Sequence, residues 1–160
     1  MSNGARVEQS RTIPVTPEQA FRGIIEMDIP TVFRRRYGPL PPIVAVSGRD
    51  AGHWSGAVGQ TRVLELGGGF GALRETVVEV DEPHAWRYRI SDLRGPLGAL
   101  LTGIDGEFLF APAGTGTRIT WRYNMFPRSP LVEPVLPAFG WFWRGYARQM
   151  LEELSKLLVK

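Results

Sequence analysis

Apolar and polar residues alternate along most of the chain between residues 43 and 125, and again near its start, and this pattern predicts β-strands. In the segment 85–90, Trp86, Tyr88 and Ile90 alternate with Arg87 and Arg89, which places the two sets on opposite faces of a strand. Segments of this kind are rich in β-branched and aromatic residues and are separated by turn-forming residues. We expect strands over 6–13, 43–47, 61–66, 73–80, 85–90, 107–111 and 118–125.

Two short helices are expected between the first two strands. Thr16, Pro17 and Gln19 stand at the N-cap, first and third positions of a capping box, which starts a helix because side chain and backbone satisfy each other's hydrogen bonds. A second helix follows Pro30, carries the cluster Arg34-Arg35-Arg36 and stops at a Gly-Pro pair, a usual helix end.

A long helix is predicted over 137–158, and it suggests how the sheet is covered. Because the strands before it are joined by short turns, they favour an antiparallel meander. We therefore expect an α+β fold, in which a curved antiparallel sheet of about seven strands wraps around this helix and two short helices follow the first strand. Apolar residues at three- and four-residue spacing form the stripe that faces the sheet: Phe139, Trp143, Tyr146, Ala147, Met150, Leu154, Leu157 and Leu158.

One face of the predicted sheet is aromatic and apolar, and the other carries alternating Arg and Glu. On the strand 73–80 we expect Thr76, Val78 and Val80 to face inward, with Arg74 on the same side. Arg62 shares the inward positions of the strand before it. The outer face is expected to be exposed and paired across strands, with the arginines Arg87, Arg89, Arg118 and Arg122.

The inward-facing rings favour a small-molecule cavity, although ordinary core filling also accounts for them. Buried tyrosine and tryptophan need hydrogen-bond partners, and a buried arginine needs an anion or a wet cavity. Because a sheet curved around a single helix leaves space, we expect a cavity of at least about 300 Å³. The residues expected to bind its ligand are Arg62, Arg74, Trp86, Tyr88, Phe108, Phe110, Trp121, Tyr123, Phe139, Trp143 and Tyr146.

Composition narrows the remaining classes of protein. The length of 160 residues suits one domain spanning 1–160, and the absence of cysteine excludes disulfides and thiolate metal sites. No segment has the roughly 18 apolar residues of a membrane span or the apolar core of a signal peptide, so we expect a cytoplasmic protein.

The net charge is +3, and the charged residues are scattered along the chain. The cluster Arg34-Arg35-Arg36 suits a solvated helix end better than a nucleic-acid patch, so no nucleic-acid partner is expected.

The sequence contains no recognisable catalytic or metal-binding motif. His53 and His84 have no carboxylate or histidine at metal-ligand spacing. His53 is either an ordinary loop residue or a base at the cavity edge. We therefore expect no metal and no cofactor, and the catalytic residues stay unknown. The apolar, glycine-rich segment 95–103 suits a flexible lip over the cavity, a strand end or a dimer contact, and a monomer and a homodimer stay open.

Short motifs follow one another along the chain: Gly59-Gln-Thr-Arg62, Arg74-Glu75 after a glycine hairpin, Asp81-Glu-Pro83, Trp86-Arg-Tyr88-Arg-Ile90, and Gly116-Thr117-Arg-Ile119-Thr-Trp121. Their order and spacing, with the long closing helix, resemble the polyketide cyclase/dehydrase branch of the START/Bet v1-like (SRPBCC) superfamily over nearly the whole chain. The resemblance implies a helix-grip fold, in which the curved sheet and the C-terminal helix enclose a hydrophobic cavity. It implies no catalytic residue, because members of the superfamily share no catalytic motif.

Three functions are compatible with these observations. The first is the binding of a hydrophobic small molecule, such as a lipid or an aromatic or polyketide-like compound, in the internal cavity. The second is an enzyme of the cyclase, aromatase or dehydratase type, whose cavity tyrosines and arginines polarise a carbonyl group. The third is a protein-interaction domain with a filled interior and an exposed apolar patch.

Overall fold

The computed structural model describes residues 5–159. Within that range seven strands form one antiparallel sheet in the order β1-β7-β6-β5-β4-β3-β2. Strands β2 to β7 pair in the order in which they follow one another along the chain, and β1 pairs with β7. The antiparallel meander expected from the sequence is therefore confirmed. The strands are β1 (Ala5–Ile13), β2 (Ile43–Ser47), β3 (Thr61–Leu66), β4 (Gly71–Asp81), β5 (Ala85–Ser91), β6 (Leu101–Ala113) and β7 (Gly116–Pro127).

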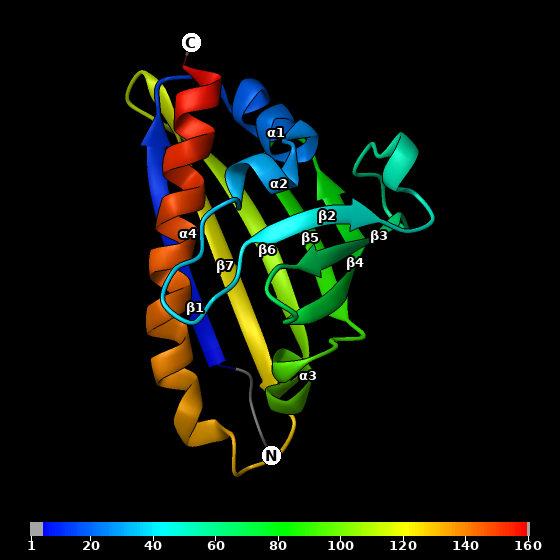
Figure 1. Cartoon of the computed structure of the whole chain (residues 1–160). Coiled ribbons are helices and arrows are strands. Elements are labelled where there is room, and N and C mark those ends of the chain that lie inside the picture. Colours follow the sequence, from blue (N-terminus) through cyan, green and yellow to red (C-terminus); the bar gives the residue numbers. More distant parts are fainter. Residues whose placement is uncertain (1–4, 160) are drawn as a thin grey trace.

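Helix α4 (Leu136–Leu158) lies lengthwise along the inner face of the curved sheet, over β1 and β7 (Figure 1). Helices α1 (Pro17–Glu26) and α2 (Ile29–Val32) cover the end of the sheet near the C-terminus of α4, and α3 (Pro96–Leu100) lies at the opposite end. This is the helix-grip arrangement expected from the sequence. In the part of the chain that the structure describes, no helix has the length and hydropathy to cross a membrane.

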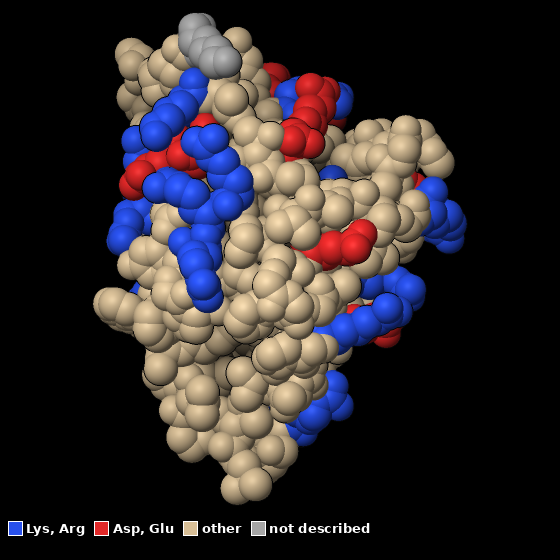
Figure 2. Space-filling view, in the orientation of Figure 1, with Lys and Arg blue, Asp and Glu red and all other residues tan. Residues whose placement is uncertain are grey.

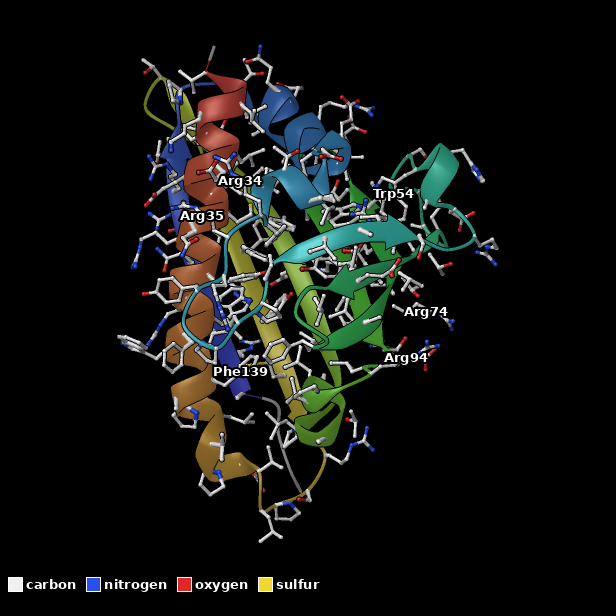
Figure 3. The ribbon with its side chains drawn as sticks, in the orientation of Figure 1. Arg34, Arg35, Trp54, Arg74, Arg94 and Phe139 are labelled. Carbon is white, nitrogen blue, oxygen red and sulfur yellow. The ribbon has the colours of Figure 1, made fainter. Side chains whose placement is uncertain are left out.

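The short helices begin where the sequence predicts, but α2 ends earlier than expected. The capping box of α1 is complete, because the Gln19 amide donates to the Thr16 hydroxyl at 3.1 Å and the Thr16 amide donates to the Gln19 side chain at 2.9 Å. Helix α2 stops at Val32, so the three arginines follow it in an irregular segment. Arg34 and Arg35 lie there against α4 (Figure 3), where both pair with Glu153.

The alternation of apolar and charged residues predicts correctly which side chains of the middle strands face inward. In the first half of β4 it predicts the wrong ones. Leu73, Glu75 and Val77 are buried there, and Arg74 is exposed and pairs with Asp92 at 2.7 Å. The cause is a β-bulge between Val77 and Glu79, which leaves the intervening residue unpaired and reverses the alternation. The expectation that Thr76 and Val78 face inward is therefore wrong, as is the inward placement of Arg74, which projects away from the sheet in Figure 3.

The outer face of the sheet carries a row of alternating charges across five strands. Arg87 contacts Glu79 at 2.6 Å and Glu107 at 2.7 Å, and Arg122 contacts Glu107 at 2.7 Å and Glu8 at 3.0 Å. The partners stand opposite one another or nearly so in the strand register, which is the cross-strand pairing expected from the sequence. The aromatic set therefore faces the other side, toward α4.

Candidate functional site

A mainly apolar cavity lies between the inner face of the sheet and the helices α2 and α4. The chain from the end of α2 to the first residue of β2, residues 33–43, passes over it and contributes Phe33, Leu40 and Pro41 to its wall. In Figure 1 this segment forms the loop in front of α4 and β7. The cavity has a volume of about 80 Å³. It is smaller than the cavity of at least about 300 Å³ expected from the sequence, so that expectation of size is wrong.

Most residues predicted to bind the ligand do line this cavity, and two lie outside its wall. Phe110 packs beneath α1 against Phe21, with ring centroids 5.3 Å apart, because the end of β6 that carries it runs past the cavity. Arg74 faces solvent because of the bulge in β4. The predicted residues that line the cavity are Arg62, Trp86, Tyr88, Phe108, Trp121, Tyr123, Phe139, Trp143 and Tyr146.

Glu75 is the lining residue of greatest chemical interest that the sequence interpretation missed. It is buried opposite Arg62 in the β3–β4 hairpin, and the Arg62 Nε donates to its Oε1 at 2.5 Å. The exposed fractions of the two side chains are 5% and 6%. A signal was present, because the glycine turn pairs Leu66 with Gly71, and counting back along both strands sets Glu75 opposite Arg62.

The Arg62–Glu75 pair puts two opposite charges into an otherwise apolar wall. The guanidinium of Arg62 also stacks over the ring of Trp54, 3.8 Å from its centroid, which is a favourable cation–π distance. Removing two charges from water costs several kcal/mol per ion, so a buried pair is weak evidence for stability alone. Polar groups in a cavity wall can fix the orientation of a bound molecule.

A second polar cluster lies on the next row of the inner face, where Tyr88, Gly106 and Tyr123 stand opposite one another on β5, β6 and β7. A Cβ atom on Gly106 would collide with the ring of Tyr88, so only glycine lets this phenol lie across the middle strand. The Tyr88 hydroxyl accepts a hydrogen bond from the Trp121 indole N–H at 2.8 Å. The row thus places phenol groups at the floor of the cavity.

Burial keeps these phenols protonated. Desolvation raises the pKa of Tyr88 well above its usual value of 10, and the nearby Tyr123 hydroxyl and Glu75 carboxylate raise it further. Burial likewise raises the pKa of Tyr123 to about 12, with Glu75 again contributing. Desolvation is also the main cause of the raised pKa of Tyr146, whose hydroxyl donates to the Pro41 carbonyl at 2.7 Å. At neutral pH all three phenols therefore keep their protons, and that of Tyr146 is already donated to Pro41.

Aromatic packing accounts for the small volume. The rings of Phe108 and Trp121 stack with centroids 5.1 Å apart, and those of Tyr123 and Trp143 stack at 4.6 Å. Trp86 is almost fully buried, and its indole N–H donates to the Gly56 carbonyl at 3.0 Å. A drug-sized ligand needs several hundred Å³, so the wall must move to admit one.

The two histidines lie away from the cavity. His53 is exposed and lies 3.4 Å from Asp50, and His84 is exposed and lies 3.7 Å from Asp81. His53 is therefore a surface loop residue, and its alternative interpretation as a base at the cavity edge is not supported by its position. Among the residues that the structure describes, no three His, Cys, Asp or Glu side chains are grouped so as to hold a metal ion.

The family model described as polyketide cyclase / dehydrase and lipid transport matches residues 4–159. The chain therefore belongs to this family. No protein of curated function matches the sequence. The family description names both catalysis on polyketides and the carriage of lipids, so membership fixes the general class of protein and leaves its particular activity open.

Solved structures with the same fold span nearly the whole chain. Protein MLL2253 from Mesorhizobium loti is 20% identical, with a TM-score of 0.67 and coverage of 96% of each chain. Protein TTHA0849 from Thermus thermophilus is 15% identical, with a TM-score of 0.67 and coverage of 97% of each chain. Norcoclaurine synthase from Thalictrum flavum, solved with dopamine and hydroxybenzaldehyde, is 16% identical, with a TM-score of 0.69 and coverage of 99% of this chain and 88% of that one. At these identities the similarity establishes the START/Bet v1-like helix-grip fold.

The buried ion pair predicts that substitutions at two neighbouring residues lower the free energy of unfolding by unequal amounts. We expect Glu75→Ala to lower the free energy of unfolding by about 3–5 kcal/mol, because it leaves the charge of Arg62 buried without a partner. The matched control Arg74→Ala removes an arginine from an exposed pair on the same strand and should cost less than about 1 kcal/mol. Urea unfolding measures both values. Similar losses at the two positions would contradict the assigned faces of β4.

The raised pKa of Tyr123 predicts a loss of stability at high pH. In the unfolded chain a tyrosine ionises near pH 10, whereas folded Tyr123 keeps its proton until about pH 12. Its contribution is therefore complete below pH 10 and is lost as the pH rises from 10 to 12, by about 2 kcal/mol. We expect Tyr123→Phe to reduce this fall in urea unfolding at graded pH. Superimposable pH profiles for the variant and the wild type would show that Tyr123 titrates normally.

Proposed function

We propose that the protein binds an apolar small molecule carrying a carbonyl or hydroxyl oxygen, with its hydrocarbon part against the aromatic wall. The observation that carries the proposal is the phenol row of Tyr88 and Tyr123 at the floor of an apolar cavity. The phenols stay protonated at neutral pH. The indole N–H of Trp143, which stacks on Tyr123, is buried with no hydrogen-bond partner among the described residues, and such a donor favours a ligand that brings an acceptor. The lipid and polyketide ligands named by the family description belong to this chemical class.

Apolar contact supplies most of the binding free energy in this proposal. Enclosing roughly 300–400 Å² of apolar ligand surface contributes a gross 7–10 kcal/mol at about 25 cal/mol per Å². Ordering the ligand and moving the wall cost part of this free energy, so we expect dissociation constants in the micromolar range.

The segment over the cavity, residues 33–43, is the part of the wall best suited to move. Its polar contacts with α4 are the hydrogen bond from Tyr146 to Pro41, a hydrogen bond from Arg148 to the Tyr37 hydroxyl at 3.3 Å, and the partly exposed pairs of Arg34 and Arg35 with Glu153. Exposed pairs contribute little stability. Displacing residues 34–41 would enlarge the cavity without disturbing the sheet, because the segment meets the sheet at its end, where Pro42 accepts from the Gly67 amide at 2.9 Å and Ile43 pairs with Leu66.

A pair of matched ligands tests the role of the phenols. We expect α-tetralone, which carries a carbonyl, to bind more tightly than tetralin, the corresponding hydrocarbon, in titrations followed by tryptophan fluorescence. Tyr123→Phe should weaken the binding of α-tetralone about tenfold, the equivalent of one lost hydrogen bond, and leave that of tetralin unchanged.

Phe110→Leu is the control variant, because Phe110 packs beneath α1 outside the cavity wall; it should bind both compounds as the wild type does. An equal loss for both compounds in Tyr123→Phe would mean that the hydroxyl does not contact the ligand. If neither compound shifts the fluorescence or the melting temperature of the wild type, the cavity does not bind ligands of this class, and the function as an interaction domain is favoured instead.

An enzymatic function is the second candidate, and the buried carboxylate of Glu75 favours it. Glu75 can accept a proton from the carbon next to a carbonyl group, while a phenol of the floor donates a hydrogen bond to the carbonyl oxygen as it gains negative charge. The product of this step is an enol or enolate, from which cyclisation or dehydration can proceed. The ion pair with Arg62 holds the carboxylate in place.

Hydrogen exchange separates the enzyme from the carrier. In D₂O an enzyme of this type would replace the hydrogens next to the carbonyl of α-tetralone with deuterium, which NMR follows directly, and Glu75→Gln would abolish the exchange while α-tetralone still binds. A carrier would bind α-tetralone without accelerating the exchange. That outcome would leave the binding function in place and remove Glu75 from a catalytic role.

A further inference from the structure

One end of the molecule is formed by exposed apolar residues. Leu131, Val135 and Trp141 have exposed fractions of 88%, 47% and 58%, and they lie in the connection from β7 to α4 and in the first turns of that helix. Figure 2 shows that this end, at the bottom of the view, carries almost no charged residue, whereas charges gather over the upper part of α4 and along the opposite edge.

The apolar end is well anchored. The Arg128 Nε donates to the Gly98 carbonyl of α3 at 2.6 Å, and the Arg128 amide donates to the Leu100 carbonyl at 2.8 Å. These bonds tie the β7–α4 connection to α3, so both move as one unit. Proline at 130 and 134 restricts the backbone of the connection further. Leu131 therefore projects from a defined structure, which lowers the entropic cost of its contact with a partner.

Basic residues follow the apolar ones along the exposed side of α4. Arg144 and Arg148 are exposed and stand three and seven residues after Trp141, so they lie on the same helix face. At 1.5 Å per residue they are about 4.5 and 10 Å further along the axis. Leu131, Trp141 and the arginines thus follow one another along the molecule. Their order matches that of the hydrocarbon core, the interfacial layer and the anionic head groups of a bilayer. Glu133 is the acidic residue of this end.

We propose that this end of the molecule docks onto a bilayer containing anionic lipids, with Leu131 and Val135 among the acyl chains, Trp141 at the interface and Arg144 at the phosphates. A second copy of the chain is a poorer partner, because a stable protein interface needs about 800 Å² on each side and this end is a narrow projection (Figure 1). Insertion into a bilayer requires only a few apolar side chains with basic neighbours.

The docking surface goes beyond the proposed function but lies next to its cavity. Leu97 of α3 and Phe139 of α4 line the cavity wall, and Figure 3 shows Phe139 on the lower part of α4, near the apolar end. A docked molecule would therefore hold its cavity close to the membrane surface, where apolar ligands of the proposed class dissolve.

Vesicle binding tests the proposal on the full-length protein. We expect it to sediment with vesicles of phosphatidylcholine mixed with phosphatidylglycerol, and more weakly with phosphatidylcholine alone. Leu131→Asp and Trp141→Asp should each weaken binding to the mixed vesicles at least about tenfold, and Arg144→Glu should remove the preference for phosphatidylglycerol. Val58→Asp is the matched control, because Val58 has an exposed fraction of 62% in a loop before β3; it should bind as the wild type does.

Each variant is also titrated with α-tetralone in the absence of vesicles. Unchanged affinity there, with vesicle binding lost, supports docking as a property separate from the cavity. The proposal is overturned if the wild type does not sediment with either vesicle, or if Val58→Asp loses as much binding as Leu131→Asp. It is also overturned if Leu131→Asp abolishes a concentration-dependent dimer and the wild type leaves vesicles unbound, because the end would then be a protein interface.

Discussion

The packing of one helix against the aromatic rows of the sheet is the constraint on which the rest of the structure depends. The sheet has a long inner face, and α4 is the element that runs along its length. Trp143 of α4 meets both Trp121 and Tyr123 of β7, with ring centroids 5.0 and 4.6 Å apart. Large rings keep helix and sheet apart where they meet, so the neighbouring strands β3 to β5 curve over space that a single helix does not fill.

Polar groups in that space are arranged by strand register. Arg62 and Glu75 pair across β3 and β4, and the phenols of Tyr88 and Tyr123 flank Gly106 on the next row. The charges and hydrogen-bond donors are thus held on strands, whereas the segment 33–43 that covers them is irregular and has few polar contacts with α4. This division suits a site that must keep its chemistry fixed while its cover opens.

The parts of the fold that follow from periodicity were predictable from the sequence. The long helix was placed within one residue of its observed start, and the inward rows of Trp86, Tyr88, Trp121 and Tyr123 follow from simple alternation. The faces of β4 could not be predicted, because the bulge inserts one residue between Val77 and Glu79 without a marker such as glycine at that position.

The lining residues of the segment 33–43 were missed for a different reason. Phe33, Leu40 and Pro41 belong to an irregular connection, in which no period relates the position of a side chain to its direction. The volume of the cavity could not be predicted either, because it depends on how the rings stack and not on which face of the sheet they occupy. The mis-assigned Phe110 has the correct inward face but the wrong position along β6.

The bulge in β4 makes the charge of the cavity wall depend on chain length rather than on residue type. Beyond the bulge Val80 pairs with Trp86, and before it Val77 pairs with Tyr88. A β4 that lacked one residue between the bulge and Glu75 would keep the pairing at Val80 and turn Arg74 inward in place of Glu75. Arg62 stands opposite Glu75 and would turn outward with it. The wall would then hold Arg74 in place of the ion pair, and an acidic ligand would suit it better than a neutral one. A one-residue insertion or deletion in this strand is therefore a route by which related chains could exchange one class of ligand for another without a change in the remaining residue types of the hairpin.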